Sequence, residues 1–424
     1  MSLVKTSLLN GISVIVKLAT SLILNKVLAV QLGPTGYAVI GQFQNLISMV
    51  GALASGAVNT GVTKYTAEYH SGSERRHAVW RTAAMISGAG GLLIAGGLFL
   101  ARVPIARWAF GDESLSGVIV WLAAALLAIL LNALLLAILS GIKAVRAFVI
   151  ANILGSLISA AAATLLVTLF GLYGALVALA TSQALACVAT LWLFHAQTET
   201  TWRAFIGPFD RAVAAKLGGF ALMSISSALL VPIGQLIIRD SLVEQLGWRD
   251  AGLWQALGRI SETHLMLLTT TLSLYFLPRF SEIKRAAELS AEVRRGFKFV
   301  VPLVVLSASL IFLIREPLVH ALLSAEFAPL ADLLGWQLLG DVLKISSWVL
   351  GFTLVSHAMT RQVILTEFIF TGLLVSFSLL GAHLDGLRGT AIGYAATYAL
   401  HGLTMLYIFR AQLIPKLQGL EKPA

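Results

Sequence analysis

The stretch SGVIVWLAAALLAILLNALLLAILSG (116–141) contains no charged residue and a single amide, Asn132. It is longer than the roughly 20 apolar residues that a helix needs to cross the hydrocarbon core of a bilayer. Runs of this kind recur along all 424 residues, of which 58% are hydrophobic and only 12% are charged. A soluble chain is about half apolar and a quarter charged. The sequence therefore predicts an all-α polytopic membrane protein.

The apolar runs divide into twelve predicted transmembrane helices. Their approximate bounds are 7–30, 37–69, 78–101, 115–140, 147–170, 173–195, 216–238, 251–279, 297–314, 332–358, 362–382 and 389–409. The second and eighth are longer than a bilayer requires, so we expect them to tilt or to project beyond it. The connections near 197–215 and 281–296 are basic, and no connection is long enough to fold as a separate domain.

Lysine and arginine are unevenly distributed between the two ends of these helices. With the N-terminus inside, 19 of the 30 lie at cytoplasmic ends and six lie on the opposite side, namely Arg102, Arg107, Arg239, Arg249, Arg315 and Arg388. Positive charge is enriched on the cytoplasmic side of membrane proteins, so both termini are predicted to be cytoplasmic. The same topology accounts for the formal net charge of +10, and a nucleic-acid partner is not expected.

Four short motifs recur at an almost constant offset. They are Arg102-Val-Pro104 with Arg315-Glu-Pro317, Gln31-Leu-Gly33 with Gln245-Leu-Gly247, Gly171-Leu-Tyr-Gly174 with Gly386-Leu-Arg-Gly389, and Ala180-Thr181 with Ala396-Thr397, at offsets of 213, 214, 215 and 216. The recurrence predicts two six-helix halves around a central cavity, a parallel repeat of the kind some transporters use. The predicted divisions are a first half at 1–196, a cytoplasmic linker at 197–215, a second half at 216–410 and a cytoplasmic tail at 411–424.

Several of the predicted helices carry polar residues at helical spacing. A charge at mid-membrane depth is costly, so such residues tend to face an interior cavity and to be functional. We expect the substrate-binding side chains to be Lys17, Asn25, Gln42, Asn45, Gln255, Arg259 and Lys344. Glu262 and Asp341 are the candidates for charge balance or ion coupling. His264 lies about 140° from Arg259 around a helix of 3.6 residues per turn, so it is expected to face elsewhere.

These polar residues also have structural interpretations. Arg259 with Glu262, and Asp341 with Lys344, are three residues apart and can neutralise each other on one helix. The small and hydroxyl residues of the predicted helix 37–69 are equally consistent with a helix-packing surface. Lys17 has no acidic residue at helical spacing within its own span, so a functional role is favoured there.

Two further features bear on mechanism. Pro232 and Gly234 fall in the middle of the predicted helix 216–238 and form a candidate hinge, because proline removes a hydrogen bond from the helix. His357 and His401 are interpreted as hydrogen-bonded core residues rather than proton carriers.

Several kinds of chemistry are not indicated. The chain lacks a GxxxxGK[ST] phosphate loop, contains no His/Cys cluster with metal-ligand spacing, and has one cysteine, Cys187. No nucleophile and base stand out, and the outer loops are too short for the acidic catalytic residues expected of a membrane glycosyltransferase. We therefore expect a protein that is not an enzyme and needs neither a cofactor nor a metal.

Five stretches carry a resemblance to a known family: KVLAVQLGPTGYAVIGQFQNLI (26–47), GVTKYTAEYH (61–70), GLWQALGRISETHL (252–265), GFKFVVP (296–302) and WQLLGDVLKISSWVLGF (336–352). They resemble the O-antigen translocase family of the multidrug/oligosaccharidyl-lipid/polysaccharide exporter superfamily, and within it the flippases of enterobacterial common antigen assembly. The resemblance runs from the first predicted span to the last. It implies movement of lipid III, an undecaprenyl-pyrophosphate-linked trisaccharide, from the cytoplasmic to the periplasmic leaflet of the bacterial inner membrane.

The resemblance also gives the polar residues a role. A pyrophosphate and an acidic sugar need cations when they enter a low-dielectric cavity. The related peptidoglycan-precursor flippases place essential arginines on their first, second and eighth helices. In this chain Lys17 falls on the first predicted helix (7–30) and Arg259 on the eighth (251–279). Helix 2 departs from that pattern, because it offers Gln42 and Asn45 without a mid-membrane cation.

The mechanism implied is alternating access, with the polyprenyl tail remaining in lipid. The expected partners are the lipid-linked oligosaccharide, membrane lipids, and the polysaccharide polymerase and chain-length proteins. Three alternatives stay open: a flippase for another lipid-linked oligosaccharide such as an O-antigen unit, a cation-coupled drug exporter of the same superfamily, and a non-transporting scaffold of the assembly machinery.

Overall fold

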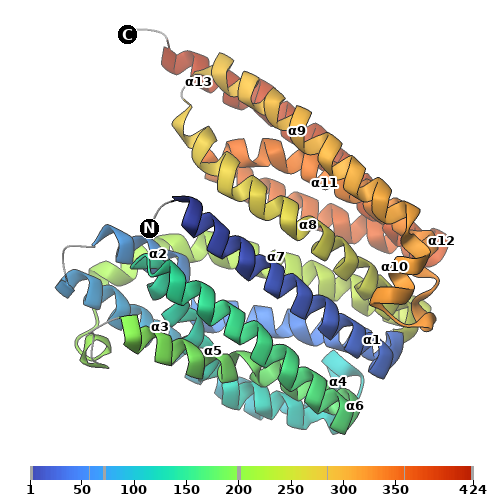
Figure 1. Cartoon of the computed structure of the whole chain (residues 1–424), viewed down its shortest axis with the longest axis horizontal. Coiled ribbons are helices and arrows are strands. Elements are labelled where there is room, and N and C mark those ends of the chain that lie inside the picture. The colour runs from blue at the N-terminus through green and yellow to red at the C-terminus, as the bar shows by residue number, and fades with distance from the viewer. Residues whose placement is uncertain are drawn as a thin grey trace. The chain divides into compact units, whose positions relative to one another are not determined.

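The computed structural model describes residues 3–56, 58–69, 73–197, 202–283, 285–357 and 359–421. The regular structure within these ranges is helical (Figure 1), which confirms the predicted all-α class. The long helices are α1 (Leu3–Ser55), α3 (Ser73–Leu100), α5 (Ser116–Gly141), α6 (Val145–Gln197), α7 (Arg211–Leu246), α8 (Trp248–Glu282), α9 (Ala286–Leu313), α11 (Leu330–Ser356) and α12 (Thr360–Ile408). The short helices are α2 (Asn59–Glu68), α4 (Arg102–Phe110), α10 (Arg315–Leu322) and α13 (Ile414–Glu421), with single turns η1 (Glu113–Leu115), η2 (Trp202–Phe205), η3 (Ala325–Phe327) and η4 (Phe409–Leu413).

Seven helical stretches among the described residues are long and apolar enough to cross a membrane. Three of them, Gly11–Ser55, Val145–Gln197 and Thr360–Gln418, are 45, 53 and 59 residues long, at least twice the roughly 20 residues of one crossing. The chain is therefore a multi-pass membrane protein. Two crossings in each of these three stretches make ten, and α7 and α8 would supply two more, so the count of twelve stays a prediction.

Two of the long helices are interrupted at corresponding glycines. The backbone of α6 leaves the helical region at Gly171 (φ 55°, ψ −136°), and that of α12 does so at Gly386 (φ 55°, ψ −137°). Side chains disfavour positive φ, so glycine is the residue suited to such a bend. The two positions are 215 residues apart, the offset of the Gly-Leu-X-Gly repeat, and their dihedral angles are the same to within a degree.

Each interrupted helix folds back on itself beyond its bend. A Cβ atom at Gly174 would collide with the carbonyl of Leu166, and one at Gly389 would collide with the carbonyl of Gly381. Leu166 and Gly381 are again 215 residues apart. α6 and α12 are thus pairs of closely packed antiparallel arms, which correspond to the predicted helices 147–170 with 173–195 and 362–382 with 389–409.

The short helices α4 and α10 begin with matching contacts. Arg102 donates to the carbonyl of Phe99 at 3.2 Å and lies 5.1 Å from its ring centre. Arg315 donates to the carbonyl of Phe312 at 3.1 Å and lies 4.4 Å from its ring centre. The repetition that the sequence predicts is therefore also a repetition of local structure.

Two of the expected elements differ from the sequence analysis. The predicted helix 37–69 is broken, since α1 ends at Ser55, Gly56 has a φ of 58°, and α2 begins at Asn59. The predicted connection 281–296 instead forms the start of α9, where Leu289 and Val293 are buried and Arg294 is exposed. This amphipathic segment packs on the core. Because α9 begins at Ala286, Pro302 lies inside the helix rather than at its start.

The chain divides into two compact units. Unit 1 comprises Met1–Leu32 and Val39–Pro232, and unit 2 comprises Gly33–Ala38 and Ile233–Ala424. The boundaries expected from the repeat, with a linker at 197–215, stay a prediction. η2 and the first turn of α7 fall within that linker, while residues 198–201 and 422–424 lie outside the described ranges.

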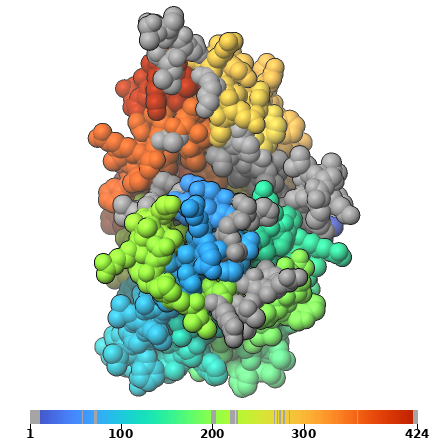
Figure 2. Space-filling view, turned by 90° about the vertical axis from the view of Figure 1, so that its left-hand side faces the viewer, coloured from blue at the N-terminus to red at the C-terminus, as the bar shows by residue number. Residues whose placement is uncertain are grey.

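Unit 1 has an aromatic core around Trp80 of α3. The indole is fully buried and donates to the hydroxyl of Thr66 at 3.0 Å. Its ring lies 6.1 Å from that of Phe194 and stacks 6.0 Å from that of Phe205. The η2 turn that supplies Phe205 lies against the start of α3 (Figure 2). This core ties the segment before α7 to the body of unit 1.

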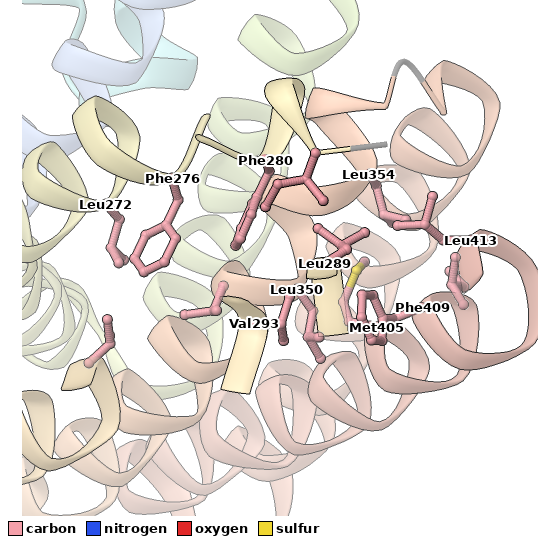
Figure 3. Close-up of a cluster of buried hydrophobic side chains, with 14 of the residues drawn as sticks. Leu272, Phe276, Phe280, Leu289, Val293, Leu350, Leu354, Met405, Phe409 and Leu413 are labelled. Carbon is pink, nitrogen blue, oxygen red and sulfur yellow. The ribbon is translucent and has the colours of Figure 1, made fainter. Parts of the chain in front are cut away.

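Unit 2 has a larger apolar core formed by α8, α9, α11, α12 and η4 (Figure 3). Its members include Phe276, Phe280, Leu289, Val293, Leu350, Leu354, Met405, Phe409 and Leu413. All of them are less than a tenth exposed. The cluster fixes α8, α9, α11 and α12 against one another, and these four helices carry most of the buried polar groups described below.

Candidate functional site

A buried arginine in unit 2 was not among the residues that the sequence predicted. Arg239 of α7 is fully buried, although the sequence analysis counted it with the outer positive charges. It donates to the amide oxygen of Gln255 on α8 and lies 5.5 Å from the ring centre of Trp254. Its Nε and one terminal nitrogen have no hydrogen-bond partner among the described residues. A buried guanidinium with open donors is suited to bind an anion.

Arg259 lies on α8 one turn beyond Gln255, close enough to interact electrostatically with Arg239. Its guanidinium hydrogen-bonds the hydroxyl of Tyr37, which is 2% exposed. The predicted pair with Glu262 is present at 3.4 Å, but the carboxylate is 68% exposed and the guanidinium 25% exposed. Exposed pairs of this kind contribute little. Arg239 and Arg259 are two guanidinium groups near one carboxylate, that of Glu262, so positive charge is in excess here.

Asp341 of α11 is the centre of a second polar group in unit 2. Its side chain is fully buried. One carboxylate oxygen, Oδ1, accepts hydrogen bonds from Ser261 of α8 at 2.5 Å and from Tyr394 of α12 at 2.9 Å. The other oxygen, Oδ2, lies 3.6 Å from Nδ1 of His264. Three helices therefore meet at one carboxylate.

The predicted pairing of Asp341 with Lys344 is not among the ion pairs of the described residues. The ammonium of Lys344 instead lies 5.2 Å, 5.5 Å and 5.9 Å from the ring centres of Tyr398, Trp348 and Tyr394. It also lies close to the hydroxyl of Tyr398. Aromatic faces stabilise a cation, so the immediate surroundings of the Lys344 ammonium are these rings and not the carboxylate of Asp341.

The three histidines singled out by the sequence are all hydrogen-bonded. His264 faces away from Arg259, as expected, and its Nε2 lies 2.8 Å from the hydroxyl of Ser307. His357 contacts the carbonyl of Ile283 at 3.2 Å, and His401 contacts Ser347 at 2.7 Å. His264 differs from the other two because it also faces Asp341, a contact that the helical angle alone did not reveal.

The predicted site residues of unit 1 lie in less polar surroundings. Lys17 is exposed and has no ion pair among the described residues, and Asn25 and Asn45 are half-buried. Gln42 is 1% exposed and donates to the carbonyl of Trp108 at 3.4 Å, which fits a packing role. The proximity of these side chains to Arg259 stays a prediction.

The candidate hinge lies in an unbroken helix. α7 continues through Pro232 and Gly234. A Cβ atom at Gly234 would lie 2.9 Å from the side chain of Thr371 on α12, so this glycine allows close packing of the two helices. Bending at Pro232 stays a prediction.

Long apolar helices, a duplicated backbone and buried charged side chains define a multi-pass membrane protein of the transporter class. Residues 3–284 match the family described as "Polysaccharide biosynthesis protein", and the chain belongs to this family. It is 33% identical over 404 residues to the lipid III flippase of Escherichia coli (strain K12), a match that covers 95% of this chain and 96% of that one. The lipid III flippase of Shigella flexneri is similar to the same extent.

Solved structures share the fold. An inward-facing multidrug resistance MATE family transporter of the MOP superfamily is 18% identical, with a TM-score of 0.82 over 96% of this chain and all of that one. A MOP superfamily transporter from Pyrococcus furiosus is 16% identical, with a TM-score of 0.70 over 97% of this chain and 96% of that one. At these identities the likeness shows the fold alone.

Proposed function

We propose that this chain is a lipid III flippase, which moves an undecaprenyl-pyrophosphate-linked trisaccharide from the cytoplasmic to the periplasmic leaflet of the bacterial inner membrane. Its product serves enterobacterial common antigen synthesis. The observation that carries the proposal is the 33% identity to the Escherichia coli lipid III flippase over 95% of the chain. A match of this extent spans both repeats.

The buried cations of unit 2 fit the charge of such a substrate. Two oxygens of a phosphate group can accept two parallel hydrogen bonds from one planar guanidinium. Arg239 has open donors, and Arg259 is held by Tyr37 and loosely by Glu262. We assign Arg259, Arg239 and Lys17 to the head group, with Gln255 and the amides Asn25 and Asn45 as candidate sugar contacts. Lys344 stays a candidate substrate contact, and Glu262 and Asp341 are assigned to charge balance.

The transport cycle proposed is alternating access without covalent chemistry. The head group leaves water for the protein while the polyprenyl tail stays in the lipid, so only the polar part needs compensation for lost hydration. The bend between inward- and outward-facing states falls near Pro232 of α7, where the missing backbone hydrogen bond lowers the cost of bending. Both termini are cytoplasmic, and the polymerase and chain-length proteins receive the product.

Flipping of purified lipid III in proteoliposomes tests the proposal. The parent should move the lipid, Lys17→Ala and Arg259→Ala should each lose most of the rate, and Arg388→Ala should flip at the parental rate. Arg388 is a matched control because its exposed side chain pairs only loosely with Asp385, at 3.7 Å. Parental rates in both Lys17→Ala and Arg259→Ala, with normal insertion, would refute the assignment of these cations.

The same vesicles separate the main alternatives. A flippase for another oligosaccharide would move an O-antigen unit on the same lipid faster than lipid III. A drug exporter would move lipophilic cations and leave both lipids where they were added. A scaffold would move none of them.

A further inference from the structure

Two buried polar atoms in unit 2 face each other without a hydrogen bond. They are Oδ2 of Asp341 and Nδ1 of His264, separated by 3.6 Å. Neither has a hydrogen-bond partner among the described residues. The two side chains are 0% and 5% exposed. A buried polar atom without a partner is costly and rare in folded proteins, so this pair calls for a physical explanation.

The contacts of the surrounding atoms indicate where the protons of this pair lie. The hydroxyl of Ser307 donates its single proton to the carbonyl of Val304 at 3.1 Å. With the Ser307 proton on this carbonyl, the 2.8 Å contact between Ser307 and His264 assigns the donor role to Nε2, a tautomer inferred from the hydrogen-bond pattern. In a neutral imidazole the other nitrogen carries only a lone pair. Nδ1 of His264 and the carboxylate oxygen of Asp341 are therefore two acceptors that face each other.

One added proton would satisfy both atoms. Placed between Nδ1 and Oδ2, it converts two opposed acceptors into a charge-assisted hydrogen bond. Oδ1 is not available for this proton, because Ser261 and Tyr394 already donate to it. We propose that Asp341 and His264 together form a binding site for one proton, and that this proton is the coupling ion of transport. The coupling role of this proton rests on the proposed flippase function.

The charged and titratable groups around the pair favour a proton over a metal cation. Lys344 lies one turn further along α11, Glu262 comes from α8, and Tyr394, Tyr398 and His401 come from α12. α9 contributes the hydroxyl of Ser307. Sodium and other hard cations need several free oxygen ligands, whereas one oxygen of Asp341 is already occupied and an ammonium stands nearby. No group of three or more His, Cys, Asp or Glu side chains suited to a metal occurs among the described residues.

The position of the pair lets a proton act on helix packing. His264 belongs to α8, Asp341 to α11, Tyr394 to α12 and Ser307 to α9. Loss of the proton restores two facing acceptors at the point where these helices meet. The unprotonated state therefore disfavours this packing, and binding or release of one proton shifts the balance between arrangements of the four helices.

The proton site is tested first without substrate. Full-length protein labelled with ¹⁵N-histidine is reconstituted in nanodiscs and titrated with acid, and the His264 signal is identified by its loss in His264→Asn. Asp341→Asn should lower the proton affinity of His264 by about tenfold or more, equivalent to one pH unit. Asp332→Asn and His383→Asn, at exposed positions, should leave the titration unchanged. An unaltered His264 titration in Asp341→Asn would overturn the site.

A second variant protects this test against misfolding of Asp341→Asn. Tyr394→Phe removes one donor from the carboxylate and keeps the packing volume. The carboxylate should become more basic, so the pair should bind its proton more tightly by about threefold to tenfold, the worth of one hydrogen bond. Unchanged or weaker proton binding in Tyr394→Phe would contradict the proposal.

Coupling is tested by flipping of lipid III under an imposed pH gradient. The gradient should accelerate the parent and His383→Asn, and the acceleration should be lost in His264→Asn and Asp341→Asn. If the parent flips without response to the gradient, the coupling role is wrong. If the parent does not flip lipid III at all, the proposed function fails, while the substrate-free titration still decides the proton site.

Discussion

The two repeats carry different residues at equivalent positions beside the same turn. Gly33 and Gly247 correspond at an offset of 214, and both have positive φ, 62° and 90°. Eight residues before these glycines, the first repeat has Asn25 and the second repeat has Arg239. Twelve residues after them, the first repeat has Asn45 and the second repeat has Arg259. The backbone is duplicated, but the two guanidinium groups are found only in the second repeat.

The same contrast separates α5 from α11. At the repeat offset of 213 to 215 residues, the counterpart of Asp341 is Leu126, Leu127 or Ala128. All three are apolar residues of α5. α5 packs well without any charge, so the fold does not require a carboxylate or an ammonium at this place. Buried ionic groups are weak evidence for stability. Their restriction to the second repeat therefore favours a functional origin.

The largest loss of flipping is expected when Arg259 is replaced by asparagine, the residue at the equivalent position 45 of the first repeat. Arg259→Asn should reduce lipid III flipping by about 100-fold, because loss of a desolvated cation at a charged ligand costs roughly 2–5 kcal/mol. Asn45→Ala should reduce it only a few-fold. The measurement is the flipping rate in proteoliposomes at matched protein density. Equal losses in the two variants would mean that the repeats share the substrate evenly and that the asymmetry is incidental.

Arg239 offers a sharper separation of function from stability. Arg239→Met removes a fully buried charge with open donors and replaces only the unbranched stem of the side chain. Replacement of a buried charge by an apolar residue is often neutral or stabilising. The midpoint of thermal unfolding in detergent should therefore be unchanged or higher, while flipping falls about 30-fold, or roughly 2 kcal/mol. A large drop in the unfolding midpoint would instead assign Arg239 to the fold.

The shared backbone is tested at the two bends. Gly171→Ala and Gly386→Ala each force a side chain into positive φ, which costs roughly 1–2 kcal/mol, although neither Cβ atom would meet a neighbour within 4 Å. We expect similar decreases in the thermal midpoint for both variants. Gly218→Ala, also without a neighbour within 4 Å and inside α7, is the control and should not lose stability. A strong effect at one bend alone would show that the repeats do not depend on this geometry equally.

The framework could be predicted from the sequence because its determinants are local. The Gly-Leu-X-Gly motif at Gly171 and Gly386 recurs in sequence and proves to be the same bend in structure. The break at Gly56 was missed, because residues on both sides of it keep helical spacing and glycine alone does not end a helix. The break is visible only in the backbone, where Gly56 has a φ of 58°, and a Cβ placed there would lie 3.2 Å from the side chain of Ile86.

The polar groups were predicted less completely, because their partners lie on other helices. Arg239 is near the end of a predicted span, where a lone arginine looks like a loop charge, and only its contacts with Gln255 and Trp254 show that it is buried. The angle between His264 and Arg259 correctly excluded a shared face. It carried no information on which residue, here Asp341, would occupy the opposite side.

The smallest predicted effect compares the caps of η1 and η3. Asp112 accepts a hydrogen bond from the amide of Ser114 at 2.8 Å, whereas Ser324, which precedes η3, makes no side-chain cap. The hydroxyl and the amide of Ser114 lower the pKa of Asp112. A carboxylate whose folded-state pKa is lowered contributes stability above its unfolded-state pKa, and this stability is lost as the pH falls through the folded-state value.

Asp112→Asn should therefore flatten the acid side of the stability profile slightly and leave the neutral side near the parent, since asparagine can also cap. Ser324→Ala should change neither side. The measurement is the thermal midpoint in detergent from neutral to acidic pH, with Asp332→Asn as a carboxylate control. A matching acid response in Ser324→Ala would mean that the two turns are stabilised alike, so that the asymmetry between the repeats would be confined to their charged membrane-spanning helices.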